Sequence, residues 1–198
     1  MGGHDGAYPV PDRHTRSRPV TEGGYFALRT ISKKICLLGD FAVGKTSLMR
    51  RFVYDLFSEK YISTIGVRVS RKTVAIPDGG DVMELTMMLW DLGGSEDFNL
   101  MRASYLRGAA GAVLVCDLTR PGTLECVRTY ADELLSISPG AHFVLAANKC
   151  DLIDQQRLTQ EQIQAAAADV NAPYYFTSAK TGDEVETLFR HLGRLLIA

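Results

Sequence analysis

The most specific chemical pattern in this chain lies at residues 39–46. They read Gly39-Asp40-Phe41-Ala42-Val43-Gly44-Lys45-Thr46, with Ser47 next, and this spacing is typical of a phosphate-binding loop. Its glycines let backbone N–H groups surround a polyphosphate, Lys45 places a positive charge on the β- and γ-phosphates, and the Thr46 hydroxyl can ligate Mg²⁺. An ordinary glycine turn is the alternative. It is disfavoured because a strand-like run precedes the loop and apolar residues at helical spacing follow it.

A carboxylate follows the apolar run that ends at Trp90. Asp91 stands at this predicted strand end, and Gly94 lies three residues further along. The carboxylate can hold Mg²⁺ directly or through water, and the N–H of Gly94 can approach a γ-phosphate closely. Alone, the pattern Asp-x-x-Gly also fits a simple turn. The phosphate loop earlier in the chain favours the metal and phosphate roles.

A base-recognition pattern closes another apolar run, at residues 143–147. It reads Asn148-Lys149-Cys150-Asp151. A carboxylate accepts two hydrogen bonds from guanine, whereas adenine offers no matching donor pair, so Asp151 would select guanine. The stem of Lys149 can lie along the ring, and Asn148 can tie neighbouring loops together. The competing interpretation is a polar turn after a strand.

A second segment is predicted to contact the base. Ser178, Ala179 and Lys180 follow the short strand-like run that ends at Thr177. The backbone N–H of Ala179 can point at the O6 atom of guanine. We therefore place these three residues in the predicted guanine site.

Strand and helix alternate over most of the chain. Apolar runs predict strands at 33–39, 67–76, 82–91, 111–117, 142–148 and 173–177. A hairpin loop at 77–81 joins the second and third strands, and helical segments separate the others. Thr159 with Gln162, and Thr181 with Glu184, match the capping box of a helix start. These elements predict an α/β fold: a doubly wound, mostly parallel six-stranded sheet with one antiparallel hairpin strand and helices on both faces. Nucleotides bind such sheets at the carboxyl ends of the strands.

Composition limits the classes of protein that fit. The 198 residues carry 22 basic and 23 acidic side chains, and the net charge of −1 gives no reason to expect nucleic-acid binding. Residues 1–30 contain three prolines and few apolar residues, which predicts a flexible N-terminal segment before a domain at 31–198. A basic arm that touches a membrane or partner is the alternative there. The four cysteines lack zinc spacing, so we expect reduced thiols and a cytoplasmic protein.

In order and spacing, these motifs resemble those of the Ras superfamily of small GTPases, and most of all its Rab-type branch. The resemblance covers about residues 33–197 and includes 61–66, which match the family's first switch, together with 90–91, 104–109 and 114–119. It implies a G domain of the P-loop NTPase fold. It also implies that Thr64 supplies a hydroxyl to Mg²⁺ and an N–H to the γ-phosphate, that Phe57 packs on the guanine face, and that 93–107 form a second switch. Such switches are ordered by γ-phosphate and Mg²⁺ contacts.

The resemblance implies a GTP-binding molecular switch that binds GTP or GDP with Mg²⁺. In Ras, a glutamine of the second switch orients the attacking water, whereas this chain has Ser95 after Gly94. Because a serine hydroxyl is too short to bridge water and γ-phosphate, we expect slow hydrolysis with Lys45, Thr64, Gly94 and Ser95 as the catalytic positions. A nucleotide-bound adaptor or scaffold that hardly hydrolyses GTP is the alternative. An ATP-dependent phosphotransferase is disfavoured by the guanine pattern.

The resemblance also predicts partners. Effectors, an exchange factor and a GTPase-activating protein are expected, and we expect a monomer. Rab-type proteins usually end in prenylated cysteines, but the last cysteine here is Cys150 and the sequence stops at Ala198. We therefore expect no covalent membrane anchor at this end. Either the chain is truncated or it is a non-prenylated relative, which includes prokaryotic ones.

Overall fold

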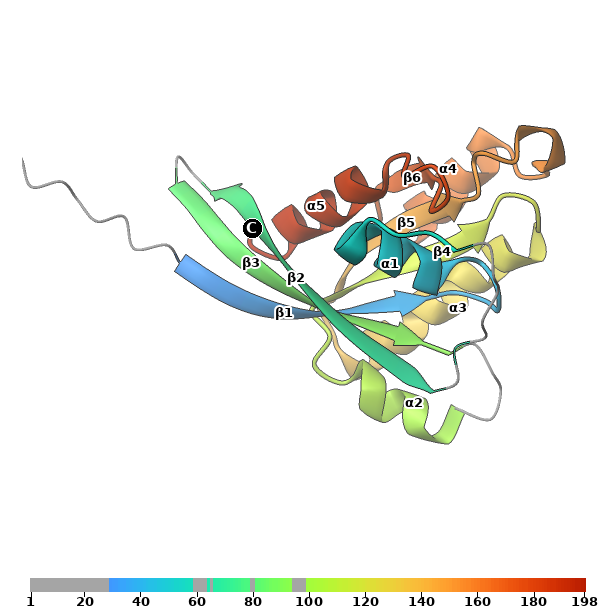
Figure 1. Cartoon of the computed structure of the whole chain (residues 1–198). Helices are drawn as coiled ribbons and strands as arrows, with labels where there is room; N and C mark the ends of the chain where they lie inside the picture. Colours follow the sequence, from blue (N-terminus) through green and yellow to red (C-terminus); the bar gives the residue numbers. More distant parts are fainter. Residues whose placement is uncertain (1–28, 59–63, 65, 79–80, 94–98) are drawn as a thin grey trace, which may run out of the picture.

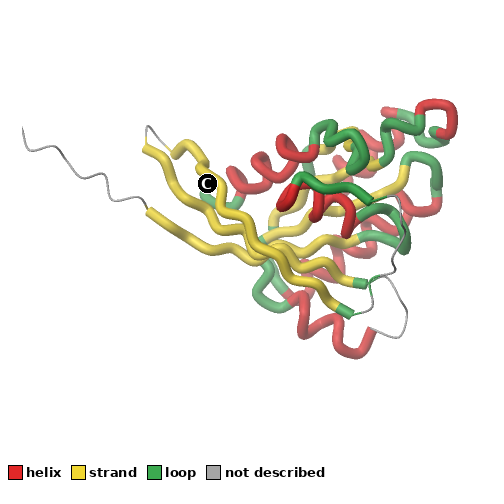
Figure 2. The backbone as a smooth tube through the Cα atoms, in the orientation of Figure 1, coloured by secondary structure: helices red, strands yellow, loops and turns green. Residues whose placement is uncertain are grey.

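The computed structural model describes residues 29–58, 64, 66–78, 81–93 and 99–198. Its centre is a six-stranded sheet in the order β2-β3-β1-β4-β5-β6, in which β2 is antiparallel to β3 and every other neighbouring pair is parallel (Figures 1 and 2). This confirms the predicted sheet. The strands are β1 (Arg29–Leu38), β2 (Val67–Asp78), β3 (Asp81–Leu92), β4 (Gly111–Asp117), β5 (His142–Asn148) and β6 (Tyr174–Thr177).

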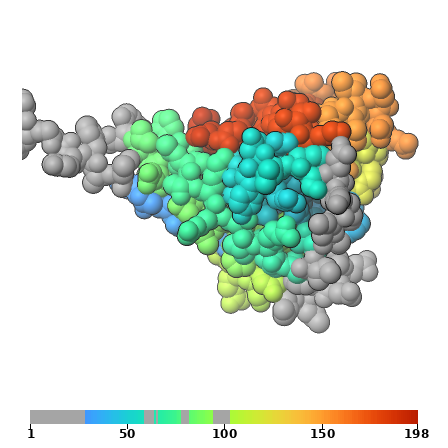
Figure 3. Space-filling model, viewed as in Figure 1, coloured from blue at the N-terminus to red at the C-terminus, as the bar shows by residue number. Residues whose placement is uncertain are grey.

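Helices cover both faces of the sheet, as predicted. Helices α1 and α5 pack on one face, and α2, α3 and α4 pack on the other. The space-filling view shows α1 between β2 and α5 (Figure 3). The helices are α1 (Lys45–Tyr54), α2 (Asn99–Leu106), α3 (Gly122–Ile137), α4 (Gln160–Asp169) and α5 (Val185–Leu195), with a short 3₁₀ helix η2 (Ile153–Gln155). No helix in the described part of the chain has the length and apolar character that crossing a membrane requires.

Alternation of side chains along β1 builds two cores from one strand. Ile35 and Leu37 face the α1 and α5 side, whereas Cys36 and Leu38 face the α3 side. All four side chains are buried, as expected for a central strand with helices on both faces. On the α1 side, the rings of Phe52 and Phe189 stack with their centroids 4.1 Å apart. The strand is thereby fixed just before the phosphate loop.

Several predicted boundaries were wrong. Strand β1 begins at Arg29, four residues before the prediction, because its first residues pair with β3 from Met83 onward. Strands β2 and β3 extend to Asp78 and from Asp81, and the turn between them lies outside the described residues. The predicted flexible segment 1–30 also lies outside them, apart from Arg29 and Thr30, which belong to β1.

One predicted helix start is confirmed and the other was wrong. The capping box at Thr159 is present: Gln162 N donates to Thr159 Oγ1 and Thr159 N donates to Gln162 Oε1. Thr181 does not cap a helix, because α5 begins only after Glu184, which adopts left-handed backbone geometry. The Thr181 hydroxyl donates instead to Asp183 Oδ2 at 2.7 Å. This local contact competes with the cap.

Candidate functional site

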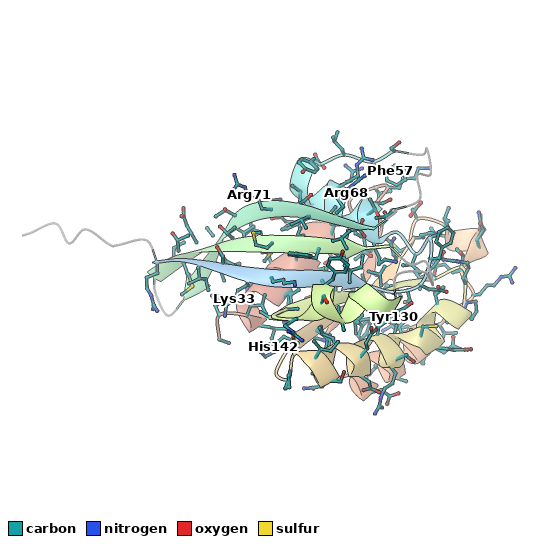
Figure 4. The ribbon with its side chains drawn as sticks, turned by 90° about the horizontal axis from the view of Figure 1, so that it is seen from below. Lys33, Phe57, Arg68, Arg71, Tyr130 and His142 are labelled. Atoms are coloured by element: carbon teal, nitrogen blue, oxygen red, sulfur yellow. The ribbon has the colours of Figure 1, made fainter. Side chains whose placement is uncertain are left out.

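A cavity of about 810 Å³ opens at the carboxyl ends of the strands. Phe57 and Arg68 both line it and lie on the same side of β2 (Figure 4). The predicted site residues that line it are Phe41, Ala42, Gly44, Lys45, Thr46, Ser47, Phe57, Thr64, Asn148, Lys149, Asp151, Ala179 and Lys180. Predicted residues that instead hydrogen-bond to this lining are Gly39, Asp40, Val43, Asp91 and Ser178. The structure thus brings both predicted segments, for phosphate and for base, to one cavity.

The two motif glycines are required by the path of the phosphate loop. Gly39 and Gly44 have φ angles of 146° and 105°, which side chains rarely allow. A Cβ at Gly39 would lie 2.2 Å from the Val115 carbonyl oxygen, and one at Gly44 would lie 2.2 Å from Asn148 Nδ2. The loop therefore packs against β4 and the end of β5 at distances that only glycine permits.

Lys45 lies across the inside of this loop. Its ammonium donates hydrogen bonds to the carbonyl oxygens of Gly39 and Asp40, both at 2.8 Å, and the residue is only 7% exposed. Helix α1 begins at Lys45, so the amino terminus of the helix faces the same cavity. A lysine ammonium beside a helix amino terminus and inward-facing amides suits a polyphosphate.

Three oxygen-bearing side chains converge beside the loop. Thr46 Oγ1 donates to Asp91 Oδ2 at 2.5 Å and lies 2.7 Å from Thr64 Oγ1, while Thr64 Oγ1 lies 3.4 Å from the same carboxylate oxygen. Asp91 is fully buried, and its Oδ1 has no hydrogen-bond partner among the described residues. Burial raises the pKa of Asp91, although Thr46 and Lys45 act in the opposite direction.

This oxygen set fits a hard cation. Mg²⁺ prefers oxygen ligands and is commonly held by one or two protein groups together with waters and phosphate oxygens. The buried Asp91 Oδ1 and the hydroxyls of Thr46 and Thr64 are ligands of that kind. The described residues contain no cluster of three or more His, Cys, Asp or Glu side chains that could hold a metal by itself.

Asn148 joins the phosphate loop to the base segments, as predicted. It is 2% exposed, and its Nδ2 donates to the Val43 carbonyl at 2.8 Å. Its Oδ1 accepts from Thr177 Oγ1 and from Ala179 N, both at 3.3 Å. The Ala179 N–H thus donates within the protein here, and its contact with guanine O6 stays a prediction.

Ser178 fixes the carboxylate that was predicted to read the base. Its buried hydroxyl donates to Asp151 Oδ1 at 2.6 Å. The Ser178 hydroxyl oxygen also accepts from the backbone N–H groups of Lys180 and Thr181, at 3.2 and 3.1 Å. The hydroxyl therefore orients Asp151 and closes the turn that follows β6.

Sequence reasoning missed the role of Asp117 at the end of β4. Its carboxylate is fully buried, and the Lys149 ammonium lies 2.6 Å from it and Arg120 Nε 2.9 Å from it. Thr119 donates to it from both its backbone N–H and its hydroxyl. Burial alone would raise the pKa of Asp117, but the contacts with Lys149, Thr119 and Arg120 hold it below its usual value. The signal was present in the sequence: an acid closes a buried strand, as at Asp91.

Sequence reasoning also missed Arg51, which connects α1 to the base segment. Its Nε donates to the Ala179 carbonyl at 3.0 Å, and its Nη2 donates to the Lys180 carbonyl at 2.6 Å. Its Nη1 pairs with Asp55 at 2.8 Å. No local pattern in the sequence marks these contacts, since the carbonyls lie more than a hundred residues away.

The remaining predictions concern residues that the structure does not describe. Gly94 and Ser95 lie outside the described residues, as do 61–63 and 65 of the predicted first switch and 94–98 of the second. The end of the predicted first switch lies beside the start of the second, because Gly93 N donates to the Gly66 carbonyl at 2.9 Å. A Cβ at Gly93 would lie 2.5 Å from the Thr64 carbonyl oxygen. Glycine is therefore needed where the two segments meet.

Comparisons with known proteins agree with this geometry. The sequence profile of the Ras family matches residues 34–198. The Ras-related protein RABF2b of Arabidopsis thaliana is 36% identical over 85% of this chain and 82% of its own length. The GTP-binding protein ypt5 of Schizosaccharomyces pombe is 37% identical over 84% and 79%, and the Ras-related protein Rab7 of Drosophila melanogaster is 37% identical over 81% and 78%.

The sheet, the loop after β1 and the shared cavity define a G domain of the P-loop NTPase fold. The chain belongs to the Ras family. Its similarity to Rab-named proteins makes it a Rab-like small GTP-binding switch protein, as the sequence motifs indicated.

Proposed function

We propose that this protein is a switch that binds GTP and GDP with Mg²⁺ and hydrolyses GTP slowly. The observation that carries the proposal is the single cavity that joins the Lys45 loop, the oxygen cluster at Asp91 and the carboxylate of Asp151. Their arrangement suits a charged tail at one end and a purine at the other. Effectors would read the surface of the two switch segments, which contact each other at Gly66 and Gly93.

At the phosphate end, Lys45 and the loop amides would bind the β- and γ-phosphates. On this proposal Lys45 exchanges its two carbonyl contacts, at 2.8 Å, for phosphate oxygens when a nucleotide binds. Thr46 and Thr64 would hold Mg²⁺, with Asp91 as a ligand or as the acceptor that orients a bound water. The metal would supply positive charge beside the phosphates.

At the base end, Asp151 would accept hydrogen bonds from guanine, with Phe57 and the Lys149 stem along its faces. Extracting the nucleotide bound to the purified protein and identifying it by chromatography tests the guanine assignment. Asp151→Asn should lower the affinity for GDP and raise that for the xanthine nucleotide, because an amide matches the xanthine edge. Unchanged affinity for GDP would remove Asp151 from the base site.

Slow hydrolysis is supported by the chemistry of Ser95 and by Phe41. Phe41 is 46% exposed at the cavity, where its ring would crowd an arginine supplied by an activating protein. Single-turnover hydrolysis of labelled GTP tests this, with Ser95→Gln as the comparison. We expect the glutamine variant to hydrolyse faster. Equal rates would exclude Ser95 as the cause of slow turnover.

A nucleotide-bound adaptor that hardly turns over is the second candidate, and Ser95 is the feature that favours it. Phosphate release under multiple turnover, with and without cell extract, separates the two candidates. Sustained release supports the switch, whereas GTP that stays intact in both samples supports the adaptor. On either reading we infer a cytoplasmic monomer, and light scattering on the purified chain tests the oligomeric state.

A further inference from the structure

The carboxylate of Asp117 lies between the phosphate loop and the base segment. Lys149, which belongs to the predicted base-binding loop at 148–151, places its ammonium 2.6 Å from Asp117 Oδ2. The phosphate loop and this loop are the two loops considered below. Arg120 places its Nε 2.9 Å from Asp117 Oδ2 and donates from Nη2 to the Phe41 carbonyl of the phosphate loop, at 2.7 Å. One buried anion therefore holds a cation from each side.

The position of this carboxylate is itself fixed. Asp117 N donates to Thr123 Oγ1 at 2.9 Å, and Thr119 donates to Asp117 Oδ1 from both N–H and hydroxyl, at 2.9 and 2.7 Å. Strand β4 pairs with β5 up to Asp117 and Asn148. These contacts hold the carboxylate in place when either loop moves. Any separation of the two loops must therefore break a hydrogen bond of a charged group, either to this buried carboxylate or to the Phe41 carbonyl.

We propose that Asp117, Arg120 and Lys149, together with the Phe41 carbonyl, control how fast the bound nucleotide leaves. This set is called the Asp117 network below, and the inference rests on the proposed nucleotide site. A nucleotide that touches both loops can leave only when they part, and the network resists that motion. Arg120 acts through the Phe41 backbone and is a positioning residue, because nothing places its side chain on the nucleotide.

The two halves of the network differ in exposure, which predicts an order of effects. The Arg120 side chain is 41% exposed, whereas that of Asp117 is 0% exposed. Water can replace part of what Arg120 contributes, but removing the charge of Asp117 leaves two neighbouring cations without their shared anion. Asp117→Asn should therefore accelerate nucleotide release more than Arg120→Ala.

The test measures release of a fluorescent GDP from the full chain, with Mg²⁺ present and unlabelled GDP in excess. Arg120→Ala should release it about tenfold faster than the parent, the loss expected for a partly exposed charged contact. Arg120→Lys should fall between them, because an ammonium can reach one of the two acceptors. Arg128→Ala is the matched control: within the described part of the chain, Arg128 pairs with Asp132 alone, on the exposed side of α3, at 3.3 Å.

Melting temperatures of the nucleotide-free proteins separate control of release from general weakening of the fold, because bound GDP would itself add a stabilisation that depends on its affinity. The proposal expects Arg120→Ala and Arg128→Ala to melt alike and to differ in release rate. It is overturned if Arg120→Ala releases GDP at the rate of the parent or of Arg128→Ala. If Asp117→Asn does not fold, the comparison of Arg120→Ala with Arg128→Ala still decides the question. A parent protein that binds no GDP would refute the proposed function instead, which keeps the two failures distinct.

Discussion

Replacing Ser178 with alanine should weaken GDP binding and reduce the preference for guanine. The Ser178 hydroxyl is fully buried and donates to Asp151 Oδ1 at 2.6 Å. It is also the acceptor for the N–H groups of Lys180 and Thr181. Alanine removes all three contacts without adding bulk. Asp151 would keep its charge and lose the donor that sets its direction.

The size of the effect follows from the partners of this hydroxyl. A hydrogen bond to a charged group contributes about 1.5–3 kcal/mol. Asp151 is only half-buried, so water can replace part of that contribution, and the lower end applies. The two amide contacts, at 3.2 and 3.1 Å, are longer and lie near the surface, so they add little. We therefore expect Ser178→Ala to bind GDP about tenfold more weakly than the parent, a change that corresponds to about 1.4 kcal/mol.

Competition titrations with GDP and with inosine diphosphate would measure both parts of the prediction. Hypoxanthine lacks the exocyclic amine of guanine, so it makes one hydrogen bond fewer to Asp151. The ratio of the two affinities should therefore shrink in Ser178→Ala. Ser136→Ala is the control, because that hydroxyl, as far as the described residues go, donates to the Glu133 carbonyl alone, on the surface of α3. An unchanged ratio of affinities would refute the orienting role of Ser178, even if both affinities fell.

Three further predictions concern folding, acid stability and metal. Phe189→Ala should lower the free energy of unfolding by about 3–5 kcal/mol in chemical denaturation, since this ring is fully buried against Phe52. The pKa of Asp117 lies below its usual 3.8, so its contribution to stability is complete above about pH 4 and is lost as pH falls through the folded pKa. The melting temperature of Asp117→Asn should thus fall less steeply in acid than that of the parent. Chelating Mg²⁺ should speed GDP release. In Asp91→Ala, the Mg²⁺ concentration needed to slow release should be at least about tenfold higher than in the parent.

Local patterns predicted the elements well where side-chain chemistry is short-range. The strand, loop and helix around Lys45 were predictable because glycines, lysine and apolar periodicity all point to one backbone path. Thr159 capped α4 as predicted, since Gln162 completes its box. Thr181 carries the same pattern and failed, because Gly182 adopts a φ of 96° and Asp183 offers a closer partner. A capping pattern is thus informative only when no local turn competes for its hydroxyl.

Contacts that join distant segments were harder to predict. Asn148 reaches Val43 across 105 residues, and Arg120 reaches Phe41 across 79 residues. Both contacts depend on β1, β4 and β5 lying side by side, an order that periodicity alone does not determine. The sequence predicted that Asn148 ties neighbouring loops together without naming Val43, whereas no motif predicted the contact of Arg120. Its acid, Asp117, was recognisable only as a polar residue closing a buried strand.

The order of the strands also decides where a cation would bind. Strand β1 and its loop lie between β3 and β4, so the phosphate loop is flanked by Asp91 on one side and Asp117 on the other. Asp117 is neutralised by two cationic side chains, whereas Asp91 is surrounded by hydroxyls, and its Oδ1 lacks a hydrogen-bond partner among the described residues. A divalent cation beside Asp117 would meet two like charges, and beside Asp91 it would meet oxygen ligands. Two buried acids at neighbouring strand ends thereby acquire opposite tasks, one suited to a metal and the other to holding the loops together.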